Sequence, residues 1–188
     1  INTKKDMKKA LVLVSMLALA GSTLGQGYVN FINYNPAQGV NGLVSRADGS
    51  AAGDTIYGQL YAAAPGGSLA PVGQPELFRN NASTGAPTGV ISGGVVEIPG
   101  IAAGGAADIQ LRSWTASAGT DYETAAGVVG AEIGMSNTIS LGSTGDGGVV
   151  TPAFLTGLEA TSMTVVPEPS TWALMALGLG ALALRRRK

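Results

Sequence analysis

The sequence predicts an all-β protein, with a single antiparallel β-sandwich or jelly-roll-like domain as its body. Glycine is abundant, at 29 of 188 residues, and glycine favours turns and extended chain over helix. Short runs of β-forming residues recur along the middle of the chain, separated by clusters rich in Gly, Pro, Asn and Ser. In several runs apolar and polar residues alternate with the period of a half-buried strand, as in the segment DIQLR at 108–112.

The predicted strands follow one another at spacings typical of sandwiches and barrels. They cover 27–33, 55–63, 89–98, 107–114, 137–142 and 160–166, with weaker runs near 42–46 and 71–78. Segment 123–136 is long enough for a short helix, but its glycines and valines argue against one. The alternation predicts these core-facing side chains: Ile56, Leu60, Val96, Ile98, Ile109, Leu111, Ile139, Leu141, Met163 and Val165.

Charge is scarce and unevenly distributed. Between Gln26 and Val166 there are three arginines and ten carboxylates, which gives a formal charge of −7. Every lysine lies outside this stretch, near the N-terminus or at the C-terminus. An acidic body without a basic face is a poor polyanion binder, so we expect no nucleic-acid partner. The chain also lacks Cys and His, which removes thiol nucleophiles, thiolate metal sites and the usual general base.

The start of the chain has the order of a secretory signal peptide. Lys8 and Lys9 form a basic region, residues 10–20 are apolar, and small residues follow up to Gly25. We expect signal peptidase to cut between Gly25 and Gln26, so residues 1–25 would be removed. Met7 is the expected initiator, which places residues 1–6 upstream of the true start.

The end of the chain combines a short apolar segment with terminal cations. Residues 170–184 carry no charge and, as a helix, would cover roughly 22 Å, somewhat less than a hydrocarbon core of about 30 Å. Local thinning and snorkelling arginines can bridge that difference. The basic residues at both ends predict that both are held on the cytoplasmic side, which places the acidic body across the membrane. The predicted basic anchor consists of Arg185, Arg186, Arg187 and Lys188.

The last segment, 166–188, closely resembles the PEP-CTERM sorting signal of Gram-negative bacteria. Pro167, Glu168 and Pro169 match its Pro-Glu-Pro motif, residues 172–184 its single span and residues 185–187 its arginine cluster. The resemblance implies that an exosortase, a membrane protease, cuts near the motif after transient insertion into the inner membrane. It also implies a mature body, residues 26–165, at the cell surface or outside the cell. Two prolines keep the motif extended, a form that a protease can read.

The body offers three weaker candidates for chemistry. Tyr57, Tyr61 and Trp114 are aromatic residues of the kind that stack on sugar rings, although core or cross-strand packing is the commoner role. Asp121 and Glu123 are close enough in sequence to share a strand face as a glycosidase pair, or to be solvated at a strand or loop edge. Asp146 lies in GSTGDGG, a loop that fits a tight turn better than a Ca²⁺ site because it holds one carboxylate.

The sequence therefore favours a secreted structural protein of the cell surface or extracellular matrix, with no catalytic site, cofactor or metal. Two alternatives remain: a carbohydrate-binding module associated with exopolysaccharide in a biofilm, and a carboxylate-dependent glycan hydrolase. Expected partners are the exosortase and signal peptidase, with exopolysaccharide or identical subunits as further candidates.

Overall fold

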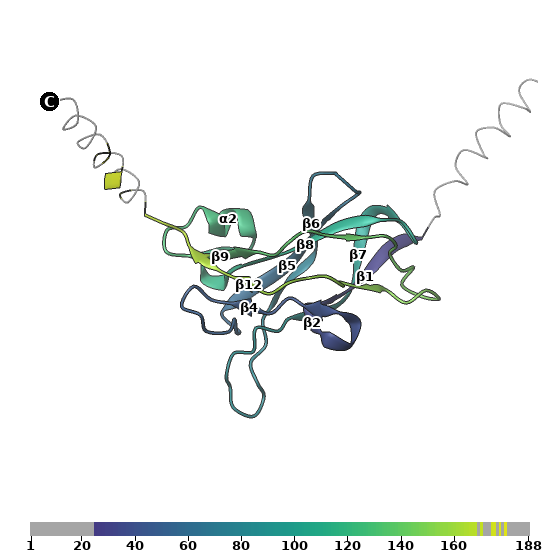
Figure 1. Ribbon diagram of the computed structural model, residues 1–188, viewed down its shortest axis with the longest axis horizontal. Coiled ribbons are helices and arrows are strands. Elements are labelled where there is room, and N and C mark those ends of the chain that lie inside the picture. The colour runs from purple at the N-terminus through teal and green to yellow at the C-terminus, as the bar shows by residue number, and fades with distance from the viewer. Residues whose placement is uncertain (1–24, 169, 171–173, 176, 178, 180–188) are drawn as a thin grey trace, which may run out of the picture.

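The computed structural model describes residues 25–168, 170, 174–175, 177 and 179 (Figure 1). The predicted signal peptide, most of the predicted span at 172–184 and the predicted basic anchor at 185–188 lie outside these residues. The elements are β1 (Gln26–Ile32), β2 (Tyr34–Asn35), β3 (Val40–Asn41), β4 (Val44–Ser45), β5 (Ile56–Ala63), β6 (Ala70–Leu77), β7 (Ser92–Ala102), β8 (Ala107–Thr115), α2 (Tyr122–Ala126), β9 (Glu132–Met135), β10 (Ile139–Leu141), β11 (Ala153–Phe154), β12 (Thr161–Ser162) and β13 (Thr164–Val165). The body is mostly strand, so the all-β prediction is confirmed.

Two larger sheets carry most of the strands. The smaller has the order β11-β1-β7, in which β1 runs antiparallel to β7 and parallel to β11. The larger has the order β13-β9-β8-β5-β6, and β10 also pairs with β8. Two small two-stranded pairings, β12 with β4 and β2 with β3, complete the pattern among the described residues.

One edge of β8 is shared by two strands, β9 and β10. β10 pairs with the first part of β8 and β9 with the last part, and the chain between them holds one residue more than the opposite stretch of β8. The Ser136 hydroxyl accepts a hydrogen bond from the Leu111 N–H at 2.9 Å, and the Ser136 N–H donates to the Leu111 carbonyl at 2.9 Å. The irregularity between β9 and β10 therefore leaves no backbone group of Leu111 unpaired.

The main core is largely aliphatic and draws side chains from both larger sheets. Val29 and Phe31 of β1 belong to the same buried cluster as Leu60 of β5 and Leu111 of β8. Of the ten predicted core side chains, eight are buried, and Leu141 is partly buried against the cluster.

The prediction for Val165 was wrong, because its side chain is 51% exposed. β13 forms the edge of the larger sheet and pairs only with β9 among the described strands, so no further strand or loop covers this residue.

A second, smaller cluster lies on the other face of the larger sheet, under α2. It consists of Tyr61, Trp114, Tyr122 and Ala125. The N-terminus of α2 is capped by Asp121, whose side chain accepts from the Thr124 N–H at 2.7 Å. Segment 123–136 therefore contains both the end of a short helix and the strand β9, which the sequence analysis did not predict.

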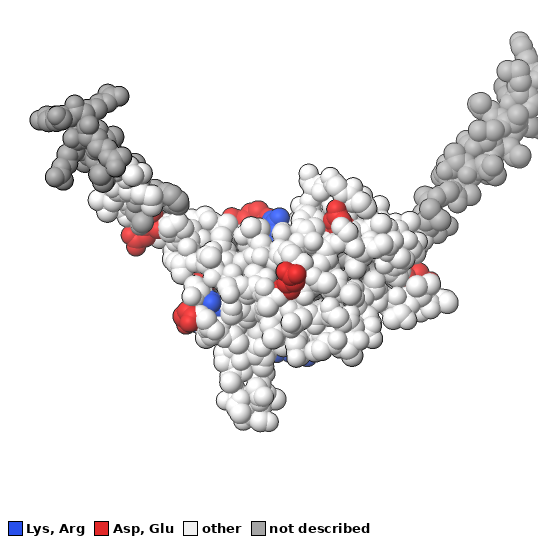
Figure 2. Space-filling model, in the orientation of Figure 1, with Lys and Arg blue, Asp and Glu red and all other residues white. Residues whose placement is uncertain are grey.

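Few charges interrupt the surface of the body. Figure 2 shows a face that is mostly uncharged, with a few separate acidic patches, some of them beside basic atoms. Two of the three body arginines are paired with glutamates, Arg46 with Glu132 and Arg112 with Glu123.

Candidate functional site

The last two strands of the body lead directly into the Pro-Glu-Pro segment. β12 pairs in parallel with β4, so that Thr161 lies beside Val44 and Ser162 beside Ser45. β13 then pairs antiparallel with β9, with Val165 beside Glu132. The end of the body is thus held by two segments that are far apart in the sequence. We call the region from β12 to Glu168 the junction.

Backbone hydrogen bonds continue up to Val166. The Met163 N–H donates to the Ser45 carbonyl at 2.8 Å. The Val166 N–H donates to the Ala131 carbonyl at 2.8 Å, and its own carbonyl accepts from the Gly130 N–H at 3.0 Å. Pro167 follows and has no N–H to donate, so this hydrogen-bonded ladder ends where the motif begins.

Met163 anchors the junction in the core. Its side chain is 2% exposed and belongs to the main core cluster. Gly134 of β9 makes this packing possible, since a Cβ at that position would lie 3.0 Å from the Met163 Cγ and 2.8 Å from the Ser113 Oγ. A larger residue at position 134 would push the junction away from β9.

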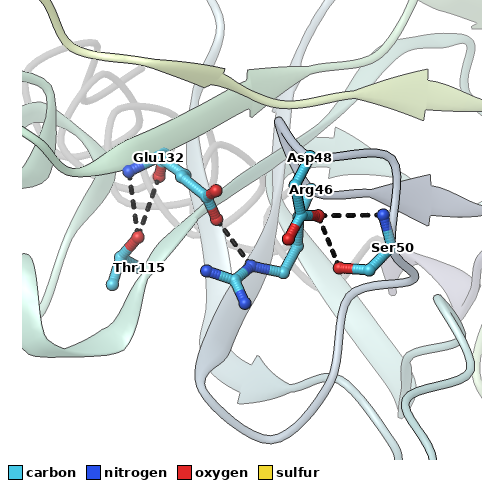
Figure 3. A network of polar contacts seen from close by, with 5 residues as sticks. All are labelled: Arg46, Asp48, Ser50, Thr115 and Glu132. Atoms are coloured by element: carbon cyan, nitrogen blue, oxygen red, sulfur yellow. Dashed lines mark hydrogen bonds and ion pairs between the residues drawn. The ribbon is translucent and has the colours of Figure 1, made fainter.

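An ion pair connects the two segments that hold the junction (Figure 3). The Arg46 Nε, just after β4, donates to Glu132 Oε2 of β9 at 2.8 Å. The glutamate side chain is 11% exposed and the arginine side chain 39%. The hydrogen bond and the negative charge of Glu132 raise the pKa of Arg46, so this arginine keeps its charge.

Neighbouring polar contacts fix both partners of that pair (Figure 3). Asp48 accepts from the Ser50 N–H at 2.9 Å and from its hydroxyl at 2.6 Å, which closes the turn after Arg46 and lowers the pKa of Asp48. On the other side, the Glu132 N–H donates to the Thr115 hydroxyl at 2.9 Å.

The described part of the motif is exposed. Pro167 and Glu168 both face solvent, and the Ser170 hydroxyl donates to Glu168 Oε2 at 3.2 Å. Pro169 lies outside the described residues. The junction therefore presents a proline and a carboxylate directly beside a firmly paired strand.

Residues 170, 174, 175, 177 and 179 are helical. Four of them expose apolar side chains: Leu174 and Leu177 by 70%, Leu179 by 65% and Met175 by 49%. Within the ranges that the structure describes, no helix is both long and apolar enough to cross a membrane.

Comparison with known families assigns the end of the chain. The model of the PEP-CTERM protein-sorting motif matches residues 165–188. Residues 165–188 thus carry the PEP-CTERM sorting motif. The motif implies export, processing by an exosortase and sorting to the cell surface or exterior. No curated protein and no solved structure matches the chain significantly.

The three aromatic candidates in the body do not form an open platform. Trp114 and Tyr61 are 0% and 1% exposed, so both are packing residues. The Trp114 Nε1 donates to the Gly119 carbonyl at 2.9 Å. Tyr57 alone remains accessible, and it lines a hollow of about 280 Å³ with Gln74, Pro75 and Thr120.

The two carboxylates considered as a glycosidase pair occupy structural positions in α2. Asp121 is the N-cap, and Glu123 accepts from the Tyr61 hydroxyl at 2.7 Å and from Arg112 Nη1 at 3.0 Å. They therefore do not share a strand face, because Asp121 caps α2 and Glu123 lies in its first turn.

Asp146 closes a tight turn. Its Oδ1 accepts from the N–H groups of Gly148 and Val150 at 2.8 and 2.7 Å, and these bonds lower its pKa. The tight-turn interpretation of this loop is thus supported by its hydrogen bonds.

Sequence reasoning identified the motif but missed the residues that hold it. Ala131, Gly130 and Ser45 form the backbone ladder of the junction, and Arg46 pairs with a glutamate 86 positions away. The sequence signal for this ion pair was Glu132 in the unpredicted strand β9. A single glutamate does not indicate which arginine it pairs with.

Proposed function

We propose that the protein is a non-catalytic β-sandwich that an exosortase processes at the junction, after which it serves as a structural component of the cell surface or extracellular matrix. The observation that carries this proposal is the end of the hydrogen-bonded ladder at Val166. The protease thus meets a complete body on one side and an exposed Pro-Glu on the other. A sandwich is supported by the single aliphatic core that the two larger sheets share.

The other end of the body supports the same proposal. β1 begins at Gln26, the residue that follows the expected signal-peptide cut, and the Gly25 carbonyl accepts from the Ala103 N–H at 2.7 Å. The expected N-terminal cut would remove this single Gly25 bond and leave β1 whole, and the ladder at Val166 ends where the sorting motif begins. The body between them is a unit that can be complete after both cuts.

A structural rather than catalytic role is favoured by the engagement of the body carboxylates. Asp48, Asp108, Asp121 and Asp146 accept hydrogen bonds from turns, caps or neighbouring strands. Glu132 is held by Arg46. Carboxylates held in this way stabilise loops and strand ends. To act as a general acid or base, such a carboxylate would have to break these hydrogen bonds before it exchanged a proton with a substrate.

The proposal is tested in the native cells by replacing Pro167, Glu168 and Pro169 together with alanine. We expect the variant to accumulate uncut in the inner-membrane fraction while the wild type is released. Alanine at Thr164, an exposed residue of the neighbouring strand, serves as a control that should be sorted normally. Unchanged release of the triple variant would contradict the proposal.

Mass spectrometry of the mature protein locates both cuts. We expect an N-terminus at Gln26 and a C-terminus at or beyond Val166, because the preceding peptide groups are paired on the sheet. A C-terminus within 160–165 would show that the protease unpairs the last strands, and the ladder would then not limit the cut.

The second candidate function, carbohydrate binding, is favoured by the hollow at Tyr57. An aromatic ring beside the polar groups of Gln74 and Thr120 suits one sugar ring. Binding of the mature protein to exopolysaccharide, lost in Tyr57→Ala and kept in Tyr34→Ala, would support this function.

A further inference from the structure

The turn after α2 exposes apolar side chains and no charge. Residues 127–130 read Gly-Val-Val-Gly, and Val128 and Val129 are 40% and 46% exposed. Val165 is 51% exposed, and Pro167 also faces solvent. We call Val128, Val129, Val165 and Pro167 the valine foot.

The turn in the valine foot is built firmly. The Val128 N–H donates to the Ala125 carbonyl at 3.0 Å, and the Ala131 N–H donates to the Val128 carbonyl at 3.1 Å. Gly130 has a φ of 80°, a conformation that glycine adopts readily. The two valines are therefore held outward by a closed turn.

The same turn lies beside the chain as it leaves the body. The Gly130 N–H donates to the Val166 carbonyl at 3.0 Å. Ser170 is already helical, and four residues span at most about 14 Å. Beyond it, Leu174 and Leu177 each expose 70% of their surface and need an apolar environment. Figure 1 shows that the α2 and β9 end of the body is the end from which the chain continues to its C-terminus.

We propose that the valine foot rests on the lipid surface of the inner membrane in the uncut precursor. The inference rests on the proposed function, because it requires the C-terminal segment to be inserted. The headgroup layer is roughly 5 to 8 Å thick on each side of the hydrocarbon core, so a tether of at most about 14 Å allows the turn to rest in this layer.

Lipid fits the valine foot better than another copy of the chain does. The tether fixes the foot near the bilayer whatever the protein concentration. Small apolar side chains without a charge can enter the interface without desolvating an ionic group. The contact would hold Glu168 at headgroup level, where a membrane protease can meet it.

The absence of cysteine in the chain allows a direct test. Single variants Val129→Cys, Val149→Cys and Leu177→Cys are labelled with an environment-sensitive fluorophore in the full-length precursor. The labelled precursor is reconstituted into phosphatidylethanolamine–phosphatidylglycerol vesicles that carry a spin-labelled headgroup quencher. Val149 is the matched control, because it is a valine that is 96% exposed and lies in the loop after Gly145, which bridges to Tyr28 of β1.

We expect the probe at position 129 to be quenched several-fold more than the probe at 149, with a blue-shifted emission. Quenching at 177 without extra quenching at 129 would overturn the valine foot and leave the proposed function intact. No quenching at 177 would show that the segment is not inserted, and both proposals would fail. A blue shift at 129 that follows protein concentration rather than the quencher would assign the foot to contacts between copies and overturn the lipid proposal.

Discussion

The two faces of strands β5 and β8 bury their side chains in different ways. On one face, Leu60 and Leu111 join an aliphatic core that both larger sheets share. On the other face, Tyr61 and Trp114 lie under the short helix α2. The first face contributes to a cluster that also contains Val29 and Phe31 of the smaller sheet, and the second face is covered by five residues of helix.

The smaller cluster compensates for its size with polar contacts. The guanidinium carbon of Arg112 lies 4.0 Å from the centre of the Tyr61 ring and 5.2 Å from that of Tyr122. Glu123 joins Arg112 and the Tyr61 hydroxyl through its two oxygens. A helix this short is marginal by itself, so these contacts and the Asp121 cap determine whether it stays in place. The comparison teaches that aromatic and charged contacts can compensate for a smaller buried apolar area where the covering element is short.

The largest effect is expected from Trp114→Ala. The change removes a fully buried indole, its two aromatic contacts with Tyr57 and Tyr122, and its hydrogen bond to Gly119. We expect a loss of about 3–5 kcal/mol in the free energy of unfolding. Amide hydrogen exchange should accelerate most in α2, and uniform acceleration in both sheets would show that the two faces are not separable.

Leu111→Ala tests the opposite face. Its side chain is 2% exposed in the main core, so truncation should cost about 2–5 kcal/mol. Denaturant unfolding followed by circular dichroism measures the change. Exchange should accelerate across both sheets here, and an effect confined to α2 would contradict the assignment of Leu111 to the shared core.

Tyr61→Phe keeps the ring and removes only the hydroxyl that donates to Glu123. We expect a loss of about 1 kcal/mol near neutral pH. Burial, followed by the bond to Glu123, raises the pKa of Tyr61 above its usual value of 10.0. Its stabilisation is therefore present below about pH 10 and declines at higher pH, as the hydroxyl is forced to ionise. The Tyr61→Phe variant should lose less stability than the wild type between neutral and strongly alkaline pH, and an unchanged alkaline profile would contradict this role.

The smallest effect is expected from Asp121→Asn, which retains a capping oxygen. The bonds from the Thr124 N–H and hydroxyl lower the pKa of Asp121 below its usual value of 3.8. The stabilisation by the charged cap is thus present above about pH 4 and is lost as the pH falls through the lowered pKa. The variant should show a shallower loss of α2 on acidification, measured by circular dichroism at pH 7 and pH 3. An equal acid response in both proteins would contradict the contribution of the charge.

Period-two alternation predicted the aliphatic face well, because sheet burial repeats every second residue. Tyr61 and Trp114 were left open between sugar stacking and packing, because alternation has no means of placing α2 over them. The run Asp121 to Thr124 contained a capping residue, but the glycines and valines after it obscured a helix of only five residues. β9 was missed because its inward Glu132 breaks the apolar pattern and is matched by a distant arginine.

The sorting motif could be predicted from the sequence since its three parts are contiguous. The residues that hold the junction could not, because Ser45 and Ala131 act through backbone groups that carry no side-chain signature. Val165 was assigned inward by alternation alone, and only the position of β13 at the sheet edge corrects it.

The pairings of β1 with β11 and of β4 with β12 have a consequence for the order of events during export. Val29 pairs with Ala153 and Val44 with Thr161. The strands near the N-terminal end of the body therefore pair with strands that lie more than a hundred residues further along the chain. A chain that crosses the membrane from its N-terminus cannot complete these sheets until nearly all of the body has emerged. Contacts of such long sequence separation also form slowly. Because the sorting motif at residues 165–188 begins at the last paired strand, β13, it emerges only after the strands that complete these sheets.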